Sequence, residues 1–421
     1  MLDIKFIREN LELVKEGARK KRIEVDVDRL MAVDDTRKEL LASIEEKRAL
    51  QNRFNDKMKG EGKVSKTHHF SDMRNIKSAI EQEEEKLKEV LKEWQMLMVQ
   101  VPNIPDMSVP EGDDDGENRE ERTWGDKPKF SFEVKNHIEL LQALDMVDFE
   151  RGVKVAGFRG YFLKNDAVML NFALWQFVLE HFKESGFTPM LVPSLLNRAA
   201  FLGTGYLPQG EEDLYKTQDG QYLAGTAEVA TMSYYMDEIL EQKQFPIKFL
   251  SFSPCFRREA GSHGKDTKGL IRVHEFYKFE QVVLCEASHE ESVKQHEKLT
   301  ENAEKLMQAL ELPYRVVVNC SGDLGLGQVK KYDLETWIPS EGKYRETHSS
   351  SYFHDFQTRR LNIRYRDGEG KTRFAHSLNN TALATPSRIM VALIENHQQE
   401  DGSIKVPKAL QKYLGKEVLS K

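Results

Sequence analysis

Two runs of apolar residues, each with the seven-residue spacing of a coiled coil, constrain the fold of this chain more than any other feature. In residues 30–58 the apolar seam positions are Leu30, Val33, Leu40, Ile44, Phe54 and Met58. In the second run they are Phe70, Met73, Ile80, Leu87, Leu91, Trp94, Met98 and Val101. A glycine-containing break at residues 60–65, with the sequence GEGKVS, separates the runs. Because two long helices joined by a short turn fold back on each other, the pattern predicts an antiparallel helical hairpin over about residues 30–101.

Basic residues gather near the predicted turn, although the chain as a whole is acidic. They are Arg53, Lys57, Lys59, Lys63 and Lys66. The formal net charge of -7 excludes a protein that coats nucleic acid indiscriminately, since such binding needs a dominant positive surface. A local patch is compatible with that charge. These residues are therefore candidates for RNA contact, with a solvated helix face or a dimerising coiled coil as the alternative interpretations.

The length of 421 residues is too great for one ordinary hydrophobic core, so we expect two domains. Residues 1–103 form the expected N-terminal domain that contains the hairpin. Residues 104–129 are rich in proline, glycine and aspartate and are expected to be a linker. In residues 130–421 amphipathic helices alternate with short β-rich runs bounded by turns, which favours an α+β fold with an antiparallel sheet.

The cysteines and the amino terminus indicate the cellular compartment. Cys255, Cys285 and Cys320 are widely separated, so the spacing suggests neither a disulfide framework nor a cysteine zinc site. The amino terminus lacks the basic and apolar layout of a signal peptide, and no apolar stretch reaches the ~18 residues of a membrane span. We therefore expect a cytoplasmic protein that does not bind a membrane.

A predicted β-hairpin carries the residues best suited to chemistry. Residues 247–257 and 269–280 are predicted strands, with a loop at 258–264 between them. Alternation in the second strand places Arg272, His274, Phe276, Lys278 and Glu280 on one face and Ile271, Val273, Tyr277, Phe279 and Val283 on the core face. Phe276 offers a platform for a planar base, and Arg257 and Arg272 can grip phosphates bidentately. The alternative is a solvent-facing hairpin whose charges pair with each other.

Five segments in chain order resemble the motifs of one enzyme family. Residues 256–261 (FRREAG) with 269–280 (GLIRVHEFYKFE) resemble motif 2 of class II aminoacyl-tRNA synthetases in its seryl form. The other segments are 175–193 for motif 1, 225–229 (GTAEV) for the serine-binding element, 346–351 with 355–360 for the metal and ATP segment, and 377–381 with 388–396 for motif 3. With the hairpin included, the resemblance to the seryl-tRNA synthetase family spans essentially the whole chain.

The resemblance implies a fold and an activity. The fold is a class II catalytic domain built on an antiparallel β-sheet flanked by helices and preceded by an antiparallel helical hairpin. The activity is that of a serine–tRNA ligase, which activates L-serine with ATP to seryl-adenylate and pyrophosphate and then transfers serine to the 3′ end of tRNA(Ser). A selenocysteine tRNA is an open alternative substrate. The partners implied are tRNA(Ser), read through its long variable arm by the hairpin, and a second copy of the chain in a homodimer.

The resemblance also implies roles for residues of this sequence. Arg257 and Arg388 are the implied catalytic residues. Serine-binding residues are Thr226, Ala227, Glu228, Arg257, Glu280 and Thr381. ATP-binding residues are Arg257, Arg258, Glu259, Arg272, Val273, Phe276, Glu346, Thr347, His348, Ser349 and Arg388. Mg²⁺, which prefers hard oxygen donors, is assigned to Glu346 and Ser349, and the tRNA-binding residues are the five basic residues of the hairpin.

Three rival functions are weaker. A coiled-coil scaffold with a partner-binding head does not explain the order of the arginines, carboxylates and Phe276. A related ligase that charges a carrier protein lacks the long arm of residues 30–101. A threonyl or prolyl enzyme would share motif 2 but differ around Thr226 to Glu228. One departure from the seryl pattern is the distance from Thr381 to Arg388, which is seven residues where the family has six.

Overall fold

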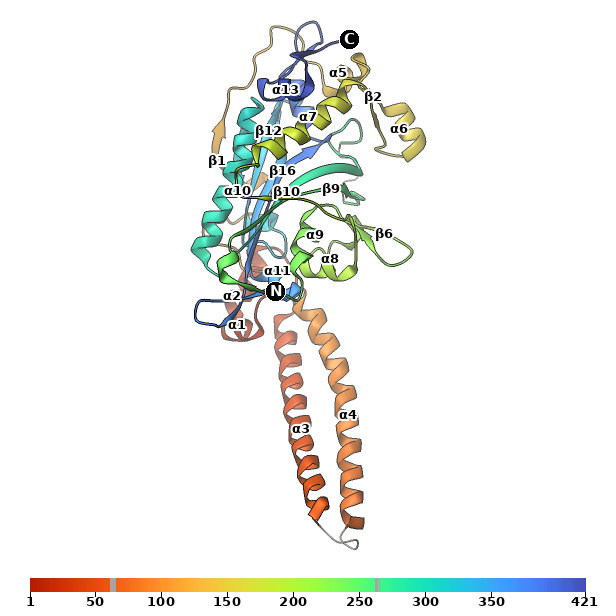
Figure 1. Cartoon of the computed structure of the whole chain (residues 1–421), viewed down its shortest axis with the longest axis vertical. Helices are drawn as coiled ribbons and strands as arrows, with labels where there is room; N and C mark the ends of the chain where they lie inside the picture. The colour runs from red at the N-terminus through yellow and green to blue at the C-terminus, as the bar shows by residue number, and fades with distance from the viewer. Residues whose placement is uncertain (61–65, 262–263, 265) are drawn as a thin grey trace. The chain divides into compact units, whose positions relative to one another are not determined.

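The computed structural model describes residues 1–60, 66–261, 264 and 266–421, with the backbone alone for 57–60 and 66–72. The chain divides into two compact units, which Figure 1 colours by residue number. The smaller unit comprises residues 2–19 and 23–102. The larger unit comprises residue 1, residues 20–22 and residues 103–421.

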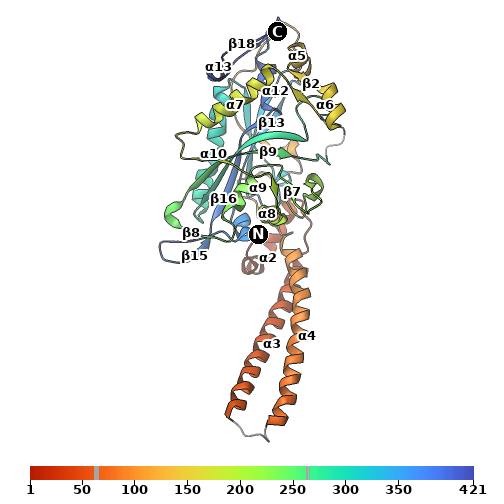
Figure 2. The ribbon, with the colours of Figure 1, turned by 45° about the vertical axis from the view of Figure 1, so that its right-hand side comes forward.

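The smaller unit contains the long helical hairpin. Its helices are α1 (Ile4–Glu9), α2 (Leu11–Lys20, whose last residue belongs to the larger unit), α3 (Val27–Gly60) and α4 (Lys66–Met98). Helices α3 and α4 run side by side in Figures 1 and 2. Their seam buries Leu30, Val33, Ile44, Ile80 and Met98, as the seven-residue spacing requires. The predicted hairpin is therefore confirmed, while most of the predicted turn lies outside the described residues.

A buried carboxylate interrupts the apolar seam. Asp34 on α3 has no exposed surface, and it pairs with Arg8, Arg37 and Lys38 at 2.7–2.9 Å. Trp94 on α4 donates its indole N–H to Asp34 Oδ1 at 3.1 Å. Burial alone would raise the pKa of Asp34, but the three cations outweigh it and lower the pKa to about 2. Asp34 is therefore an ionised link between the two helices of the hairpin.

An eight-stranded sheet forms the centre of the larger unit. In spatial order its strands are β1 (Arg119–Trp124), β11 (Tyr314–Val318), β12 (Lys330–Ile338), β13 (Lys343–His354), β16 (His376–Thr385), β10 (Glu275–Cys285), β9 (Ile247–Phe256) and β4 (Thr188–Leu191). Neighbouring strands are antiparallel except β4 and β9, which are parallel. The α+β prediction with an antiparallel sheet is confirmed.

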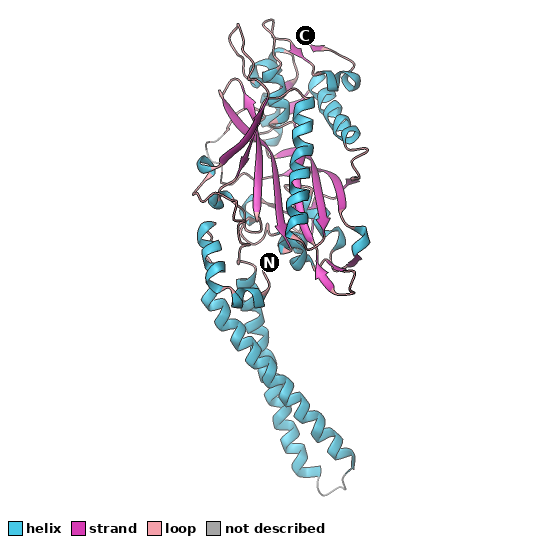
Figure 3. Ribbon diagram, turned by 90° about the vertical axis from the view of Figure 1, so that its left-hand side faces the viewer, coloured by secondary structure: helices cyan, strands magenta, loops and turns pink. Residues whose placement is uncertain are grey.

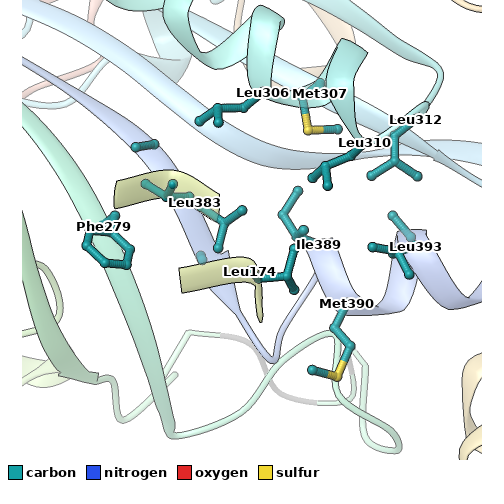
Figure 4. Close-up of a cluster of buried hydrophobic side chains, with 14 of the residues drawn as sticks. Leu174, Phe279, Leu306, Met307, Leu310, Leu312, Leu383, Ile389, Met390 and Leu393 are labelled. Atoms are coloured by element: carbon teal, nitrogen blue, oxygen red, sulfur yellow. The ribbon is translucent and has the colours of Figure 1, made fainter. Parts of the chain in front are cut away.

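Helices cover the sheet and bury its apolar side chains. Helix α10 (His289–Ala309) lies along the sheet in Figure 3, and α7 (Asp166–His181) and α12 (Ile389–Asn396) pack against the same hydrophobic cluster. Figure 4 shows the cluster where Leu306 and Met307 of α10 lie close to Ile389 of α12. Leu383 of β16 and Phe279 of β10 complete it from the sheet. This core holds β10, β13 and β16, which carry seven of the sixteen predicted serine-, ATP- and metal-binding residues.

Short elements complete the larger unit. Its remaining helices are α5 (His137–Ala143), α6 (Phe149–Ala156), α8 (Arg198–Thr204), α9 (Glu228–Met232), α11 (Phe356–Leu361) and α13 (Lys408–Leu414). Its remaining strands are β2 (Val147–Asp148), β3 (Phe162–Leu163), β5 (Leu195–Leu196), β6 (Tyr215–Lys216), β7 (Tyr222–Leu223), β8 (Ile239–Glu241), β14 (Arg364–Arg366), β15 (Thr372–Phe374), β17 (Ile404–Lys405) and β18 (Val418–Leu419). Among the described helices, none is long and apolar enough to span a membrane.

Two local predictions differ from the structure. Residues 119–124, within the segment expected to be a linker, form strand β1 at the edge of the main sheet, so that segment is not a free linker. The second strand of the predicted β-hairpin begins at Glu275 and not at residue 269. Gly269 has a positive φ of 80°, and the Leu270 N–H bonds to His137 Nε2 at 3.2 Å in place of a strand neighbour. Arg272 consequently lies in a loop.

Candidate active site

Two adjoining cavities lie over the strands β9, β10, β13 and β16. The first, here called the arginine cavity, is lined by Arg257, Glu259, Ile271, Arg272, Val273, Phe276, Lys278, Glu346, Thr347, Ser349, Thr381, Ala384, Ser387 and Arg388. The second, here called the carboxylate cavity, is lined by residues that include Glu228, Arg257, Lys278, Glu280, Ser349 and the loop 325–328. Because Arg257, Lys278 and Ser349 line both, the two cavities are neighbours that share these side chains.

Arg257 holds the position where the cavities meet. It directly follows strand β9, and its backbone N–H donates to the carbonyl of His274 at 2.9 Å. Its guanidinium donates twice to the carbonyl of Gly225 at 3.3 Å and lies 5.3 Å from the ring centroid of Phe276. These contacts fix a permanently charged, planar group beside an aromatic ring.

The other two arginines of the arginine cavity are paired with carboxylates. Arg272 Nη1 donates to Glu259 Oε2 at 2.5 Å. Arg388, the residue before α12, lies 3.1 Å from Glu346 Oε2 and donates to the Glu346 carbonyl. Both pairs leave a guanidinium on the lining of the cavity, where it can exchange its carboxylate for a phosphate.

Glu346 is the carboxylate best placed to hold a cation in the arginine cavity. Burial would raise its pKa, but Arg388 and Lys331 outweigh burial and lower the pKa to about 2. Ser349, three residues further along β13, adds a hydroxyl oxygen to the same cavity. Within the described residues no group of three or more His, Cys, Asp or Glu side chains could hold a metal ion. A cation here would therefore rely on these two hard oxygen donors together with its substrate, which suits Mg²⁺.

The carboxylate cavity contains two buried acids with fixed partners. Tyr206 donates to Glu228 Oε2 at 2.9 Å, and Gln357 donates to Glu228 Oε1 at 2.7 Å. Glu280 Oε2 lies 2.6 Å from Lys278 Nζ, and both side chains are buried. Burial raises the pKa of Glu228 and, despite Lys278, that of Glu280. A cavity with two acids, Lys278 and Arg257 suits a small molecule that carries both an ammonium and a carboxylate.

The two cavities bring together most of the predicted substrate-binding residues. Thr381, predicted in the serine site, lines the arginine cavity and hydrogen bonds with Glu280. Ile271 and Val273, placed on the core face by alternation, line the arginine cavity because the strand begins only at Glu275. The bulge at Phe279 and Glu280 shifts the register of β10 against β16 further along the strand.

Four predicted residues line neither cavity. Thr226 is buried and accepts a hydrogen bond from the Glu228 N–H at 3.2 Å, and Ala227 is the residue before α9. Arg258 donates to the Glu212 carbonyl at 3.0 Å. His348 is buried, its Nδ1 lies 2.9 Å from Thr347 Oγ1, and burial lowers its pKa to about 4. Their assigned roles stay predictions.

The RNA-contact residues of the hairpin are described only in part. Arg53 is exposed on α3. Lys57 and Lys59 belong to α3 and Lys66 to α4, but their side chains lie outside the described residues. Lys63 lies wholly outside them.

Sequence reasoning missed several residues of the site. Tyr206 and the loop 325–328 carry no motif that would have marked them. Gln357 lies within the segment 355–360 that resembled the metal and ATP segment, yet it contacts Glu228. Lys278 was placed on the polar face of β10 without a role. Its buried pairing with Glu280 could be read only from the structure.

Comparison with known proteins agrees with this geometry. Residues 214–397 match the family described as tRNA synthetase class II core domain (G, H, P, S and T). The antiparallel sheet, with three arginines and Phe276 around one cavity, defines a class II aminoacyl-tRNA synthetase. Residues 1–105 match the family described as Seryl-tRNA synthetase N-terminal domain. The Serine--tRNA ligase of Deinococcus radiodurans is 46% identical over 431 residues, which cover 100% of this chain and 99% of the relative. The chain belongs to the seryl-tRNA synthetase family.

Solved structures show the same likeness. A seryl-tRNA synthetase from Pyrococcus horikoshii complexed with ATP has a TM-score of 0.92 and 39% identity, over 100% of this chain and 99% of the other. A cytoplasmic Serine-tRNA ligase from Naegleria fowleri in complex with AMP has a TM-score of 0.88 and 32% identity, over the same shares of the two chains.

Proposed function

We propose that this chain carries out the two-step reaction of its family, the ligation of serine to tRNA, in the two adjoining cavities. ATP occupies the arginine cavity and serine occupies the carboxylate cavity. The observation that carries the proposal is that Arg257 lines both cavities, so one guanidinium can reach the α-phosphate and the serine carboxylate together. The ATP and AMP complexes of the two similar structures support a nucleotide in this site.

In this proposal, different residues of the arginine cavity contact the adenine and the phosphates of ATP. Phe276 stacks on the adenine ring, with Glu259 close to it. Arg272 and Arg388 contact the phosphate tail, each by releasing its carboxylate partner. Glu346 and Ser349 would hold Mg²⁺, which would neutralise phosphate charge when bound.

The carboxylate cavity accounts for serine. Glu228, which accepts hydrogen bonds from Tyr206 and Gln357, receives the substrate ammonium. Glu280 accepts the hydrogen bond of the serine hydroxyl, and the neighbouring Lys278 favours the ionised form of Glu280. A site built to bond a hydroxyl rejects alanine, because alanine leaves the buried Glu280 without its partner.

The chemistry needs alignment more than proton transfer. An oxygen of the serine carboxylate bonds to the α-phosphorus, and the bond from that phosphorus to the oxygen leading to the β-phosphate breaks, so pyrophosphate leaves. Arg257 lies beside the α-phosphate and stabilises the negative charge of the transition state. In the second step a hydroxyl of the terminal ribose attacks the seryl carbonyl carbon, the bond to the adenylate breaks, and AMP leaves.

The hairpin supplies the tRNA specificity in this proposal. Residues 1–103 act as the tRNA-binding domain and residues 130–421 as the catalytic domain. The basic residues near the hairpin turn contact the long variable arm of tRNA(Ser) by its backbone and shape, as proteins usually read paired RNA. A tRNA for selenocysteine with a long variable arm is a further candidate substrate.

A homodimer completes the proposal, with the arm of one subunit serving the site of the other. Its support is a set of exposed apolar side chains on α7 and β4, two elements that overlap residues 175–193, the segment that resembles motif 1. Met169, Phe172, Leu179 and Leu191 are large apolar side chains that are 45–84% exposed there. We place the dimer in the cytoplasm, since translation uses its product.

The experiment is amino-acid-dependent exchange of pyrophosphate into ATP, run with each of the twenty amino acids. Serine alone should support exchange, Mg²⁺ should be required, and Arg257→Ala should abolish it. Exchange that survives Arg257→Ala, or that another amino acid supports equally, contradicts the assignment. Deletion of residues 35–98 should spare serine-dependent exchange and abolish tRNA charging. Loss of both activities would mean that the hairpin is needed for the catalytic fold.

A further inference from the structure

One wall of the carboxylate cavity is a short loop without a charged side chain. Gly325, Leu326, Gly327 and Gln328, between β11 and β12, line the cavity together with Glu228 and Glu280. A loop that contains two glycines has many accessible backbone conformations, so its shape must be fixed by contacts from elsewhere.

Lys21 makes the first set of these contacts. Its ammonium donates to the carbonyls of Gly325 at 3.0 Å, Leu326 at 3.2 Å and Gln328 at 2.5 Å. Burial lowers the pKa of Lys21 well below its ordinary value, while the three carbonyl acceptors around Nζ match the three N–H donors of the ammonium form. Lys21 is 3% exposed, and among the described residues no carboxylate is paired with it.

Asn103 makes the second set. Its backbone N–H donates to the Leu326 carbonyl at 2.9 Å. Its side-chain amide donates to the carbonyls of Gly327 at 3.1 Å and Phe353 at 2.8 Å. Lys21 and Asn103 together therefore bind every main-chain carbonyl from residue 325 to residue 328, and Phe353 lines the same cavity.

A role in stability alone is a poor explanation for Lys21. Burying an ammonium among neutral carbonyls costs free energy that an apolar side chain of the same length would avoid. The ammonium instead fixes the conformation of the loop, because hydrogen bonds to one nitrogen atom hold three of its carbonyls close together.

Lys21 and Asn103 both lie at boundaries between the two units of the chain. The smaller unit comprises residues 2–19 and 23–102, so Lys21 lies between its two segments and Asn103 directly follows its last residue. The two side chains that fix the cavity wall thus stand at the points where the chain passes to and from the hairpin unit.

We propose that Lys21 and Asn103 are positioning residues for the amino-acid site: they hold the main chain of residues 325–328 in the shape that accepts serine. This inference rests on the proposed function of the carboxylate cavity. It goes beyond that function because neither residue touches a substrate, and both lie far in sequence from the motifs of the catalytic domain.

The test compares Michaelis constants in the full-length chain by pyrophosphate exchange. Lys21→Met keeps the length of the side chain and removes its three donors. We expect the KM for serine to rise roughly ten- to a hundredfold, the range that follows from misplacing a binding surface by about 1 Å, while the KM for ATP stays within about twofold. Lys20→Met is the matched control, since Lys20 is partly exposed, pairs with Glu111 and should leave both constants unchanged.

Asn103→Ala is the second variant and guards against a folding defect in Lys21→Met. It removes the two side-chain hydrogen bonds and keeps the backbone N–H, so a smaller rise in the serine KM with an unchanged ATP KM is expected. If either variant folds with an unchanged circular dichroism spectrum and its serine KM stays at the wild-type value, the inference is wrong. An equal rise in both constants also overturns it, because that result indicates a general structural defect. Failure of the proposed function is distinguishable, since the wild type would then lack serine-dependent exchange.

Discussion

Replacing Lys278 by Met tests the electrostatics of the serine site directly. Lys278 Nζ lies 2.6 Å from Glu280 Oε2, and the two side chains are 8% and 2% exposed. Met has nearly the same length and no charge, so the change removes the ion pair and leaves little empty space. Glu280 is then a buried acid without its cation. Burial already raises the pKa of Glu280, so loss of Lys278 should raise it further and increase the protonated fraction, although Arg257 still favours the ionised form.

The magnitude follows from the weakening of the hydrogen bond to the serine hydroxyl. A hydrogen bond to a carboxylate contributes about 1.5–3 kcal/mol and one to a neutral carboxyl about 0.5–1.5 kcal/mol, so full protonation costs about 1–1.5 kcal/mol. At about 1.36 kcal/mol for each factor of ten, kcat/KM for serine should fall roughly 5- to 13-fold. The KM for ATP should change less, because the proposed adenine and phosphate contacts are those of Phe276, Arg272 and Arg388, although Lys278 also lines the arginine cavity.

Pyrophosphate exchange between pH 6 and pH 9 is the assay. A carboxyl with a raised pKa becomes an acceptor only as pH rises through that pKa. Activity of the Lys278→Met variant should therefore recover toward high pH, while the wild type changes little. Lys343→Met, on an exposed part of β13, is the control. A folded Lys278→Met variant that keeps the wild-type kcat/KM for serine at pH 7 would refute the reasoning.

Three further predictions concern stability, each measured by urea unfolding of the full chain. Asp34→Asn should destabilise the hairpin by about 1–3 kcal/mol, because Trp94 and the surrounding cations lose an ionised partner. Because the pKa of Asp34 in the wild type is lowered from 3.8 to about 2, its stabilising contribution is present above pH 3.8 and is lost as pH falls through about 2. Burial lowers the pKa of His296 from 6.5 to about 4, so its stabilising effect is full above pH 6.5 and lost as pH falls toward 4. Between pH 7 and pH 5, protonation of His296 should lower the free energy of unfolding of the wild type by about 2 kcal/mol. The variant His296→Gln, which can still donate to the Ser350 carbonyl, should not show this loss. An unchanged pH dependence in the variant would contradict this. Leu383→Ala should cost about 2–5 kcal/mol by opening a cavity in the core, and a cost well below 1 kcal/mol would mean that the core closes around the change.

Periodic patterns predicted those elements whose side chains alternate between core and solvent. The seven-residue spacing located α3 and α4, and among the described seam residues Leu30, Val33, Ile44, Ile80 and Met98 are buried. Alternation also placed Phe276, Lys278 and Glu280 on one face of β10 and toward the cavities. These patterns succeed because burial of apolar side chains decides the local structure there.

Contacts between distant residues could not be predicted in the same way. The strand start at Glu275 depends on His137, which accepts a hydrogen bond from Leu270. Strand β1 has an exposed and highly charged sequence, and only its pairing with β11 makes it a strand. The contacts of Lys21 with the loop 325–328 join residues about 300 positions apart. None of these has a local sequence signal, because tertiary neighbours supply the hydrogen bonds.

The carboxylate partners of Arg272 and Arg388 have a consequence for turnover. In the arginine cavity each of these guanidiniums has a negative neighbour, Glu259 or Glu346. In the proposed function, an incoming triphosphate displaces those neighbours, and they pair again with the arginines when pyrophosphate departs. We therefore expect the free enzyme to bind inorganic anions weakly and to release pyrophosphate readily.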